Sequence, residues 1–236
     1  MTGADDLGRI DFFRFDDDAE FGMKIAPQQH RAKVTIENIL QSTGELLEEQ
    51  NFDNLSTSQI CERAGLTPPA LYRYFPNKYA ILMEMGQRIL IEQHETYVRW
   101  IKAGGIKDGS RQAIFDSLHG MAVHMIDAIR SRPGGREMCQ ILRTLPALSL
   151  MRRRVREHSL DMTLVHLSQF QLAVSEVRAR RVLNLLMEIF LVSIELIVDD
   201  DPEGATDATK IVCDMAANQV HKFVTPVSGQ SGTVAH

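Results

Sequence analysis

The chain has 236 residues, of which 44% are hydrophobic and 24% are charged, and its formal net charge is −5 with a pI of about 5.9. This length and composition are those of a soluble globular protein with an ample core, either one domain or a small domain joined to a larger one. The three cysteines are widely spaced, which excludes a disulfide framework and a Cys-rich zinc site and favours a reducing, cytoplasmic location.

The first 26 residues form an acidic segment with seven acids against three bases. We interpret it as a flexible acidic arm. It is either an unstructured leader without function or a self-masking arm that competes for a basic surface elsewhere in the chain. No signal peptide is expected, because the segment lacks a basic cluster followed by an apolar run.

The first helix is expected from about Gln28 to Gln50. Apolar residues recur along it at helical spacing, as Ile36, Leu40 and Leu47 illustrate. This pattern predicts an amphipathic helix whose buried side supports the elements that follow.

Residues 55–82 contain the clearest local signals in the chain. Ser56 followed three residues later by Gln59 is a capping box, which predicts a helix that begins at Thr57. Gly65 is the residue best able to adopt the left-handed conformation that ends a helix. The segment therefore predicts a short helix followed by a tight turn.

A second short helix is predicted directly after this turn. Thr67 is expected as its N-cap, because Pro68 favours extended geometry in the residue before it and occupies the first helical position without loss of a hydrogen bond. Pro76 ends this helix, and Asn77 is expected to cap a longer helix that begins near Lys78. Helix, tight turn and helix form the helix-turn-helix pattern, whose second helix can enter the major groove of DNA.

From about residue 31 to residue 82 the chain resembles the DNA-binding head of the TetR family of bacterial transcriptional regulators. The features that carry the resemblance are the first helix (ENILQSTGELLEEQ), the Asn51-Phe52-Asp53 turn, Ile60 with Ala64-Gly65-Leu66, and the run from Leu71 to Lys78 (LYRYFPNK). The last run is specific, since a generic helix-turn-helix does not require an aromatic-rich second helix followed by Asn-Lys. Two departures are Asn51, where the family usually has glycine, and Cys61, where alanine is common.

The resemblance implies that Tyr72 and Lys78 contact phosphates, while the start of the second helix faces base edges. The candidate DNA-contacting residues are Thr57, Ser58, Thr67, Pro68, Pro69, Ala70, Tyr72, Arg73, Tyr74 and Lys78. The acidic net charge argues mildly against a nucleic-acid partner, but residues 57–80 carry one acid against three bases. Replacing Tyr72 with Phe and Lys78 with Ala together is predicted to abolish operator binding and leave a dimer intact.

The rest of the chain is predicted to be helical, at residues 78–102, 110–132, 136–143, 147–170, 182–198 and 207–223. The segment 182–198 is the most apolar, but it is too short and too polar for a membrane span. In the architecture that the resemblance implies, it packs on its own domain and, with the last helix, forms a homodimer interface with the same helices of a second copy.

The predicted fold is all-α, with a three-helix helix-turn-helix head joined to a larger helical domain. The predicted ranges are 1–26 for the arm, 27–80 for the DNA-binding domain, 81–225 for effector binding and dimerisation, and 226–236 for a flexible tail. The resemblance implies an effector cavity, and Met-rich walls suit apolar ligands. The candidate lining residues, many of which can equally be plain core, are Trp100, Phe115, His119, Met121, Met125, Met138, Met151, Met162, His166 and Met187.

The function that these observations predict is that of a homodimeric regulator which binds a palindromic double-stranded operator and is released by a small, largely apolar effector. Repression is the default in the family, and activation stays open. No cofactor, metal or membrane partner and no enzymatic activity is expected. Two alternatives are a DNA-bound adaptor that recruits a protein partner without an effector, and a helical metalloenzyme that uses His158 and His166.

Overall fold

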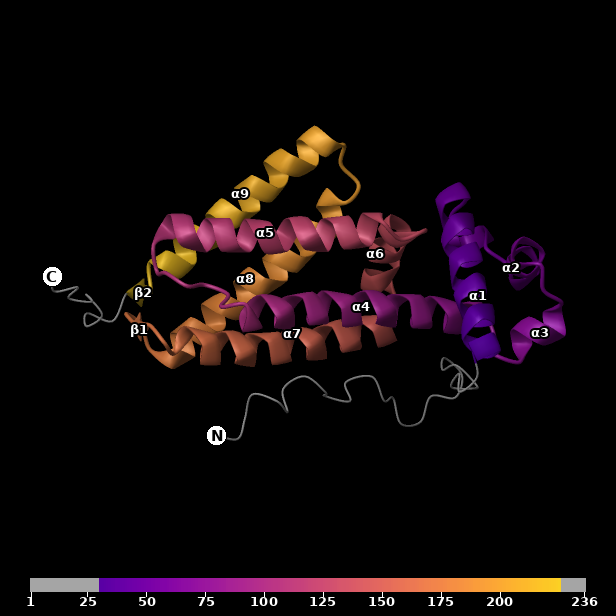
Figure 1. Cartoon of the computed structure of the whole chain (residues 1–236), viewed down its shortest axis with the longest axis horizontal. Helices are drawn as coiled ribbons and strands as arrows, with labels where there is room; N and C mark the ends of the chain where they lie inside the picture. The colour runs from indigo at the N-terminus through magenta and orange to yellow at the C-terminus, as the bar shows by residue number, and fades with distance from the viewer. Residues whose placement is uncertain (1–29, 226–236) are drawn as a thin grey trace, which may run out of the picture. The chain divides into compact units, whose positions relative to one another are not determined.

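The computed structural model describes residues 30–225, which are almost entirely helical (Figure 1). The elements are α1 (His30–Glu49), the 3-10 helix η2 (Phe52–Asn54), α2 (Thr57–Ala64), α3 (Pro68–Tyr72), α4 (Lys78–Lys102), α5 (Arg111–Arg130), α6 (Gly135–Thr144), α7 (Pro146–Leu167), α8 (Glu176–Ile197) and α9 (Pro202–His221). They confirm the predicted all-α fold with an N-terminal helix-turn-helix. The predicted acidic arm and the predicted tail lie outside the described residues.

The last two helices begin several residues earlier than predicted. Ser175 caps α8, since its side chain accepts a hydrogen bond from the Arg178 amide, and Asp201 caps α9 by accepting one from the Gly204 amide at 2.8 Å. Pro202 then occupies the first helical position of α9. Apolar periodicity marks only the buried part of a helix, so it missed these polar first turns.

A short strand pair adds to the helical fold. Strands β1 (Gln171–Leu172) and β2 (Val224–Thr225) pair antiparallel, with Leu172 opposite Val224. Two residues per strand are too few to give the alternation by which a strand is found in a sequence. The pair joins the α7–α8 connection to the end of α9.

The structure divides into two compact units. Unit 1 contains the described residues up to Glu92 together with Asp127–Arg154, and unit 2 contains Gln93–Ile126 and the described residues from Val155 onward. The core of unit 1 joins α1 to α4 with α6, through side chains such as Ile39, Leu71, Phe75 and Met138. The predicted domain boundary at residue 80 stays a prediction.

The core of unit 2 joins α5, α7, α8 and α9. Ile114, Leu167 and Leu183 meet Ala217 and Phe223 in one buried cluster. No helix within residues 30–225 is long and apolar enough to cross a membrane.

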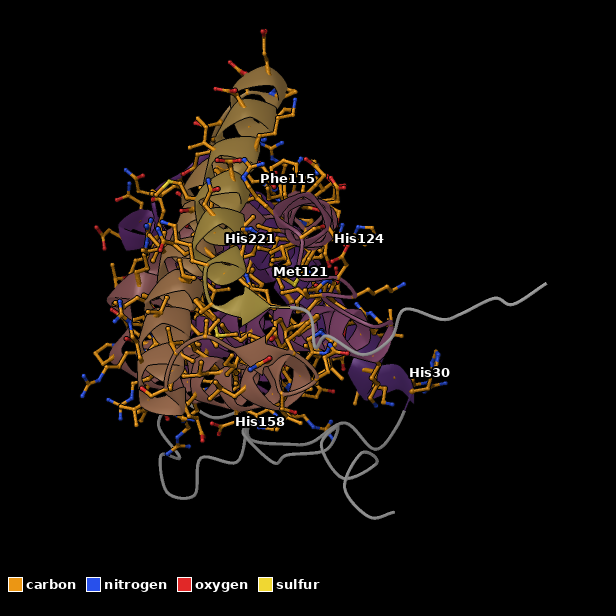
Figure 2. All side chains as sticks on the ribbon, turned by 90° about the vertical axis from the view of Figure 1, so that its left-hand side faces the viewer. His30, Phe115, Met121, His124, His158 and His221 are labelled. Carbon is orange, nitrogen blue, oxygen red and sulfur yellow. The ribbon has the colours of Figure 1, made fainter. Side chains whose placement is uncertain are left out.

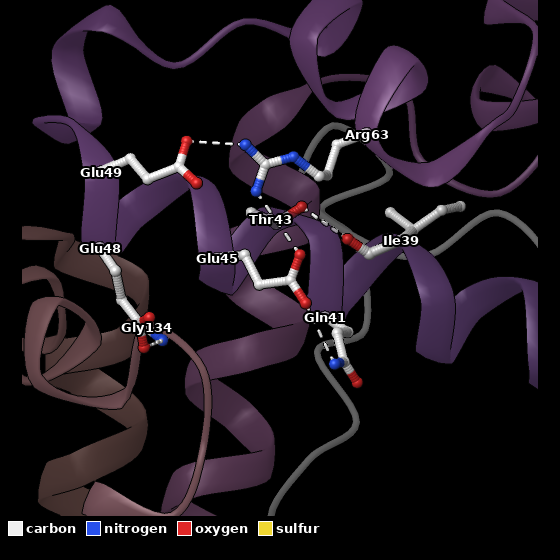
Figure 3. A network of polar contacts seen from close by, with 8 residues as sticks. All are labelled: Ile39, Gln41, Thr43, Glu45, Glu48, Glu49, Arg63 and Gly134. Carbon is white, nitrogen blue, oxygen red and sulfur yellow. Dashed lines mark hydrogen bonds and ion pairs between the residues drawn. The ribbon is translucent and has the colours of Figure 1, made fainter.

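Within unit 1, α1 packs unusually closely against the turn between α5 and α6. A Cβ atom at Gly44 would lie 2.2 Å from the carbonyl oxygen of Pro133, far inside van der Waals contact. Beside it, the Glu48 carboxylate accepts a hydrogen bond of 2.9 Å from the amide of Gly134 (Figure 3). Gly134 has a φ of 68°, which favours glycine. Glycine is therefore required on α1 for the two backbones to approach.

Candidate nucleic-acid interface

The helix α2 begins and ends as its sequence predicts. The Ser56 hydroxyl accepts from the Gln59 amide at 3.3 Å, and the Gln59 side chain accepts from the Ser56 amide at 2.9 Å. At the other end Gly65 is left-handed, with φ 62° and ψ 35°, and the Leu66 amide donates to the Cys61 carbonyl. These bonds define the sharp turn that leads into α3.

Side chains of α1 and α2 hold this turn in place. The Arg63 guanidinium lies 2.7 Å from the Glu49 carboxylate and 3.5 Å from that of Glu45 (Figure 3). The hydrogen bond from Arg63 lowers the pKa of Glu49. From the other side, the Asn38 side chain donates to the Ala64 carbonyl at 2.8 Å. The end of α2 is thus fixed to α1 by polar contacts that helical periodicity did not reveal.

Thr67 occupies the N-cap of α3 with extended geometry, as predicted, but its side chain makes no capping hydrogen bond. The reason is local. Pro68 and Pro69 fill the first two positions and have no N–H, and the Ala70 amide donates to the Thr67 carbonyl instead. The hydroxyl of Thr67 and the rings of Pro68 and Pro69 are exposed, so the start of α3 offers a protruding and largely apolar surface.

Tyr72 ends α3 with its side chain 42% exposed, so it is not a buried packing residue. Its phenol oxygen lies 3.0 Å from the hydroxyl of Thr57 at the start of α2. Arg73 is also exposed, and its guanidinium lies 5.9 Å from the centre of the Tyr74 ring. A phenol, a hydroxyl and a guanidinium on adjoining parts of α2 and α3 are suited to phosphate contact.

Lys78, the first residue of α4, has a structural role that its sequence position does not reveal. Its ammonium donates to the carbonyls of Phe52 and Asp53 at 3.3 Å and of Leu55 at 2.9 Å. It also lies 4.7 Å from the centre of the Phe52 ring. Because an ammonium has three N–H groups, these carbonyls use all of them. Contact between Lys78 and a phosphate stays a prediction, and it requires at least one of these bonds to be exchanged.

We expect Lys78→Ala to lower the free energy of unfolding by about 2 kcal/mol, because three carbonyls at the end of η2 lose a charged donor. Tyr72→Phe is the matched control. It removes only one exposed hydroxyl contact and is expected to cost less than about 1 kcal/mol. Urea titrations of both variants measure the difference. Equal stabilities would show that the carbonyl contacts of Lys78 contribute nothing to the fold.

The candidate DNA-contacting residues therefore lie on one continuous stretch of unit 1, from the start of α2 to the start of α4. Ser58, Thr67, Pro68, Pro69, Tyr72 and Arg73 are exposed, and Thr57, Ala70, Tyr74 and Lys78 are half-buried. Leu71 and Phe75 are fully buried, as expected for core positions.

The candidate ligand residues are dispersed. Met138 and Met151 are fully buried in the core of unit 1. In unit 2, Met125 and Met162 are buried and Met187 packs beside the core. Phe115, which Figure 2 labels, stacks on His119 with ring centres 5.6 Å apart.

Trp100 and Met121 line a cleft of about 660 Å³ in unit 2, between the C-terminal part of α4, the loop after it, and α5. We call this the α4–α5 cleft. Arg99, Lys107, Asp116, Ser117 and Gly120 also line it. Its volume lies within the range of small-molecule sites.

The histidines have separate structural partners. His166 Nε2 accepts from the Ile106 amide at 3.0 Å, and burial lowers the pKa of His166. The ring of His158 lies 5.2 Å from that of His94, whose pKa burial and the neighbouring His158 lower to about 4. Across residues 30–225, no group of three or more His, Cys, Asp or Glu side chains could hold a metal ion. His158 and His166 thus do not form a common site.

Comparison with known sequences places the similarity in the helix-turn-helix. Residues 39–85 match the family described as bacterial regulatory proteins, tetR family. The chain is 30% identical over 113 residues to the class A tetracycline repressor protein from transposon 1721 of Escherichia coli, covering 45% of this chain and 50% of that protein. It is 42% identical over 50 residues to the class G repressor of Vibrio anguillarum, covering 21% and 24%. The chain thus matches at most half the length of these relatives.

Solved structures show the same fold over most of the chain. A tetR-family transcriptional regulator from Streptomyces coelicolor superposes with a TM-score of 0.57 at 17% identity, covering 84% of this chain and 92% of that one. GusR of Salmonella enterica gives a TM-score of 0.54 at 14% identity, covering 83% and 100%. The helices after residue 85 therefore share their arrangement with these proteins while their sequences differ.

Proposed function

The chain belongs to the TetR family of bacterial regulatory proteins, and from that premise we propose that it is a transcriptional regulator that binds a palindromic DNA operator as a dimer. The observation that carries the proposal is the exposed first turn of α3. Thr67, Pro68 and Pro69 protrude there while Arg63 and Asn38 fix the preceding turn to α1. A rigidly held, protruding helix start is what insertion into a major groove requires.

The base contacts that the first turn of α3 can make are mostly apolar, and they suit thymine methyl groups. Much of the sequence preference then comes from phosphate positioning, operator shape and half-site spacing.

Selection from a pool of random duplex DNA by the full chain tests the proposal. We expect enrichment of an inverted repeat whose half-sites are about 34 to 36 Å apart, one helical turn, if the dimer places its heads in successive major grooves. Recovery of no sequence above background would contradict DNA recognition.

Exposed apolar side chains on α8 and α9 support dimerisation through the two C-terminal helices. On α8, Leu185, Ile189 and Leu196 are 63%, 48% and 53% exposed, and on α9 Ile211 and Met215 are 53% and 54% exposed. α8 and α9 also pack against each other. These side chains stand four and seven residues apart along their helices, and apolar side chains at such spacings on an exposed helix side are typical of a helix–helix interface.

We expect Ile189→Glu to convert the dimer to a monomer, because a second copy would bury the new carboxylate at the interface without a partner. Val165→Glu is the matched control, since Val165 is 69% exposed and lies on α7 rather than on the apolar side of α8 or α9. Sedimentation of both variants measures the change. A dimeric Ile189→Glu variant would place the interface elsewhere.

Regulation by a small effector completes the proposal, with repression as the default direction. The dimer has two states that differ in the distance between their two helix-turn-helix heads. The effector binds one state more tightly than the other and thereby shifts the dimer towards it. The α4–α5 cleft supports an effector over a protein-recruiting adaptor, because the adaptor alternative expects a body filled by side chains. Membership in a family of regulatory proteins supports a binding protein rather than an enzyme.

A further inference from the structure

The α4–α5 cleft contains a glycine that the fold does not require. Gly120 lies in the middle of α5, where glycine is the least favourable residue after proline. A Cβ atom there would meet no atom within 4 Å, and its φ lies outside the positive range. Gly120 differs in this respect from Gly44, whose missing side chain the backbone contact with Pro133 requires. Gly120 is exposed and lines the cleft, so the space beside it is open.

On the α4 side of the cleft lies the Trp100 ring, which is held in a fixed orientation. The Trp100 indole N–H donates to the Ser117 hydroxyl at 2.9 Å, and that hydroxyl donates to the Gly105 carbonyl at 2.7 Å. The ring of Tyr97 lies 5.4 Å from the Trp100 ring, centre to centre. Since its polar edge is already bonded, the half-buried indole offers an apolar ring for contact.

The charged side chains of the cleft favour an anion. Lys107 extends from the α4–α5 loop and has no ion-pair partner in the described part of the chain. Arg99 contacts Glu95 only at 3.8 Å, with both side chains more than 60% exposed, so this pair is weak. The one carboxylate in the lining, Asp116, already accepts a hydrogen bond from Gln112 at 2.8 Å.

We propose that the α4–α5 cleft binds a small amphiphile with an aromatic or otherwise apolar body over Trp100 and one anionic group, such as a carboxylate, towards Lys107. The inference deepens the proposed function, because it gives the chemical class of the effector. Binding of the ligand in the α4–α5 cleft is nevertheless measurable on the free protein, without DNA. A chain that binds the ligand but no operator would overturn the proposed function alone.

Trp100 is the only tryptophan in the chain, so its fluorescence reports occupancy of this cleft directly. The probes are 4-phenylbutyrate, 4-phenylbutanol and 4-phenylbutylamine, which share one body and differ in charge. We expect a saturable change in Trp100 emission with the acid at a dissociation constant at least about tenfold below that of the amine, the alcohol lying between them. Equal affinity for acid and amine, or no saturable change with any probe, would overturn the proposal.

Three variants separate binding in the cleft from binding elsewhere. Gly120→Phe fills the open space and is expected to weaken 4-phenylbutyrate by more than about tenfold, whereas Gly120→Ala stays within about threefold of the parent chain. Lys107→Gln is expected to weaken the acid by about tenfold and leave the alcohol unchanged. Unchanged affinity for the acid in a folded Gly120→Phe variant would place the ligand outside this cleft.

Discussion

Pro69→Glu is expected to reduce affinity for the selected operator by about a hundredfold or more. Pro69 is the second residue of α3 and is exposed. A carboxylate there would face DNA phosphates and base edges, and juxtaposed like charges cost several kcal/mol, which corresponds to about two decades in the dissociation constant. The free protein is expected to fold normally, because an acid in the first turn of a helix interacts favourably with its dipole.

Pro69→Gln is the matched control, since glutamine has nearly the same shape as glutamate without its charge. It is expected to lose less than about tenfold in affinity. Gel-shift titrations at one fixed salt concentration compare the two variants, because affinity for DNA depends steeply on salt. Binding of Pro69→Glu at the parent level would mean that the first turn of α3 does not face the DNA.

Gly44→Ala and Gly120→Ala are expected to change stability in opposite directions although both replace a glycine within a helix. At Gly44 the new Cβ would lie 2.2 Å from the Pro133 oxygen and 2.6 Å from its carbonyl carbon, so backbone must shift. Overpacking of this kind costs about 1–3 kcal/mol, only partly offset by the better helix propensity of alanine. At Gly120 the Cβ meets nothing, and alanine is expected to add about 0.5–1 kcal/mol.

Thermal unfolding at one protein concentration measures both changes, since the stability of a dimer depends on concentration. For a chain of this size we expect Gly44→Ala to lower the midpoint by several degrees and Gly120→Ala to raise it by about 2 °C. Loss of stability in both variants would mean that α5 also needs glycine for its packing.

The sequence by itself determined the helix-turn-helix, because the signals that define it are local. Ser56 with Gln59, Gly65, and Asn77 each act within a few residues, and the structure shows the bond of each where it was predicted. Thr67 is the N-cap of α3 with the predicted extended geometry, and the nearby Ala70 amide donates to its carbonyl rather than to its side chain. Fold class followed from the same helical periodicity along the rest of the chain.

Only the tertiary structure decided what the more distant residues do. Lys78 reaches carbonyls 23 to 26 residues away, and Gly44 contacts a turn about 90 residues along the chain. Likewise Trp100 and Gly120 lie in one cleft, whereas Met138 and Met151 are fully buried in the core of the other unit. Helical periodicity shows which side of a helix is buried but not which element covers it, so it could not separate cleft from core. That distinction depends on contacts between residues far apart in sequence, which only the folded chain contains.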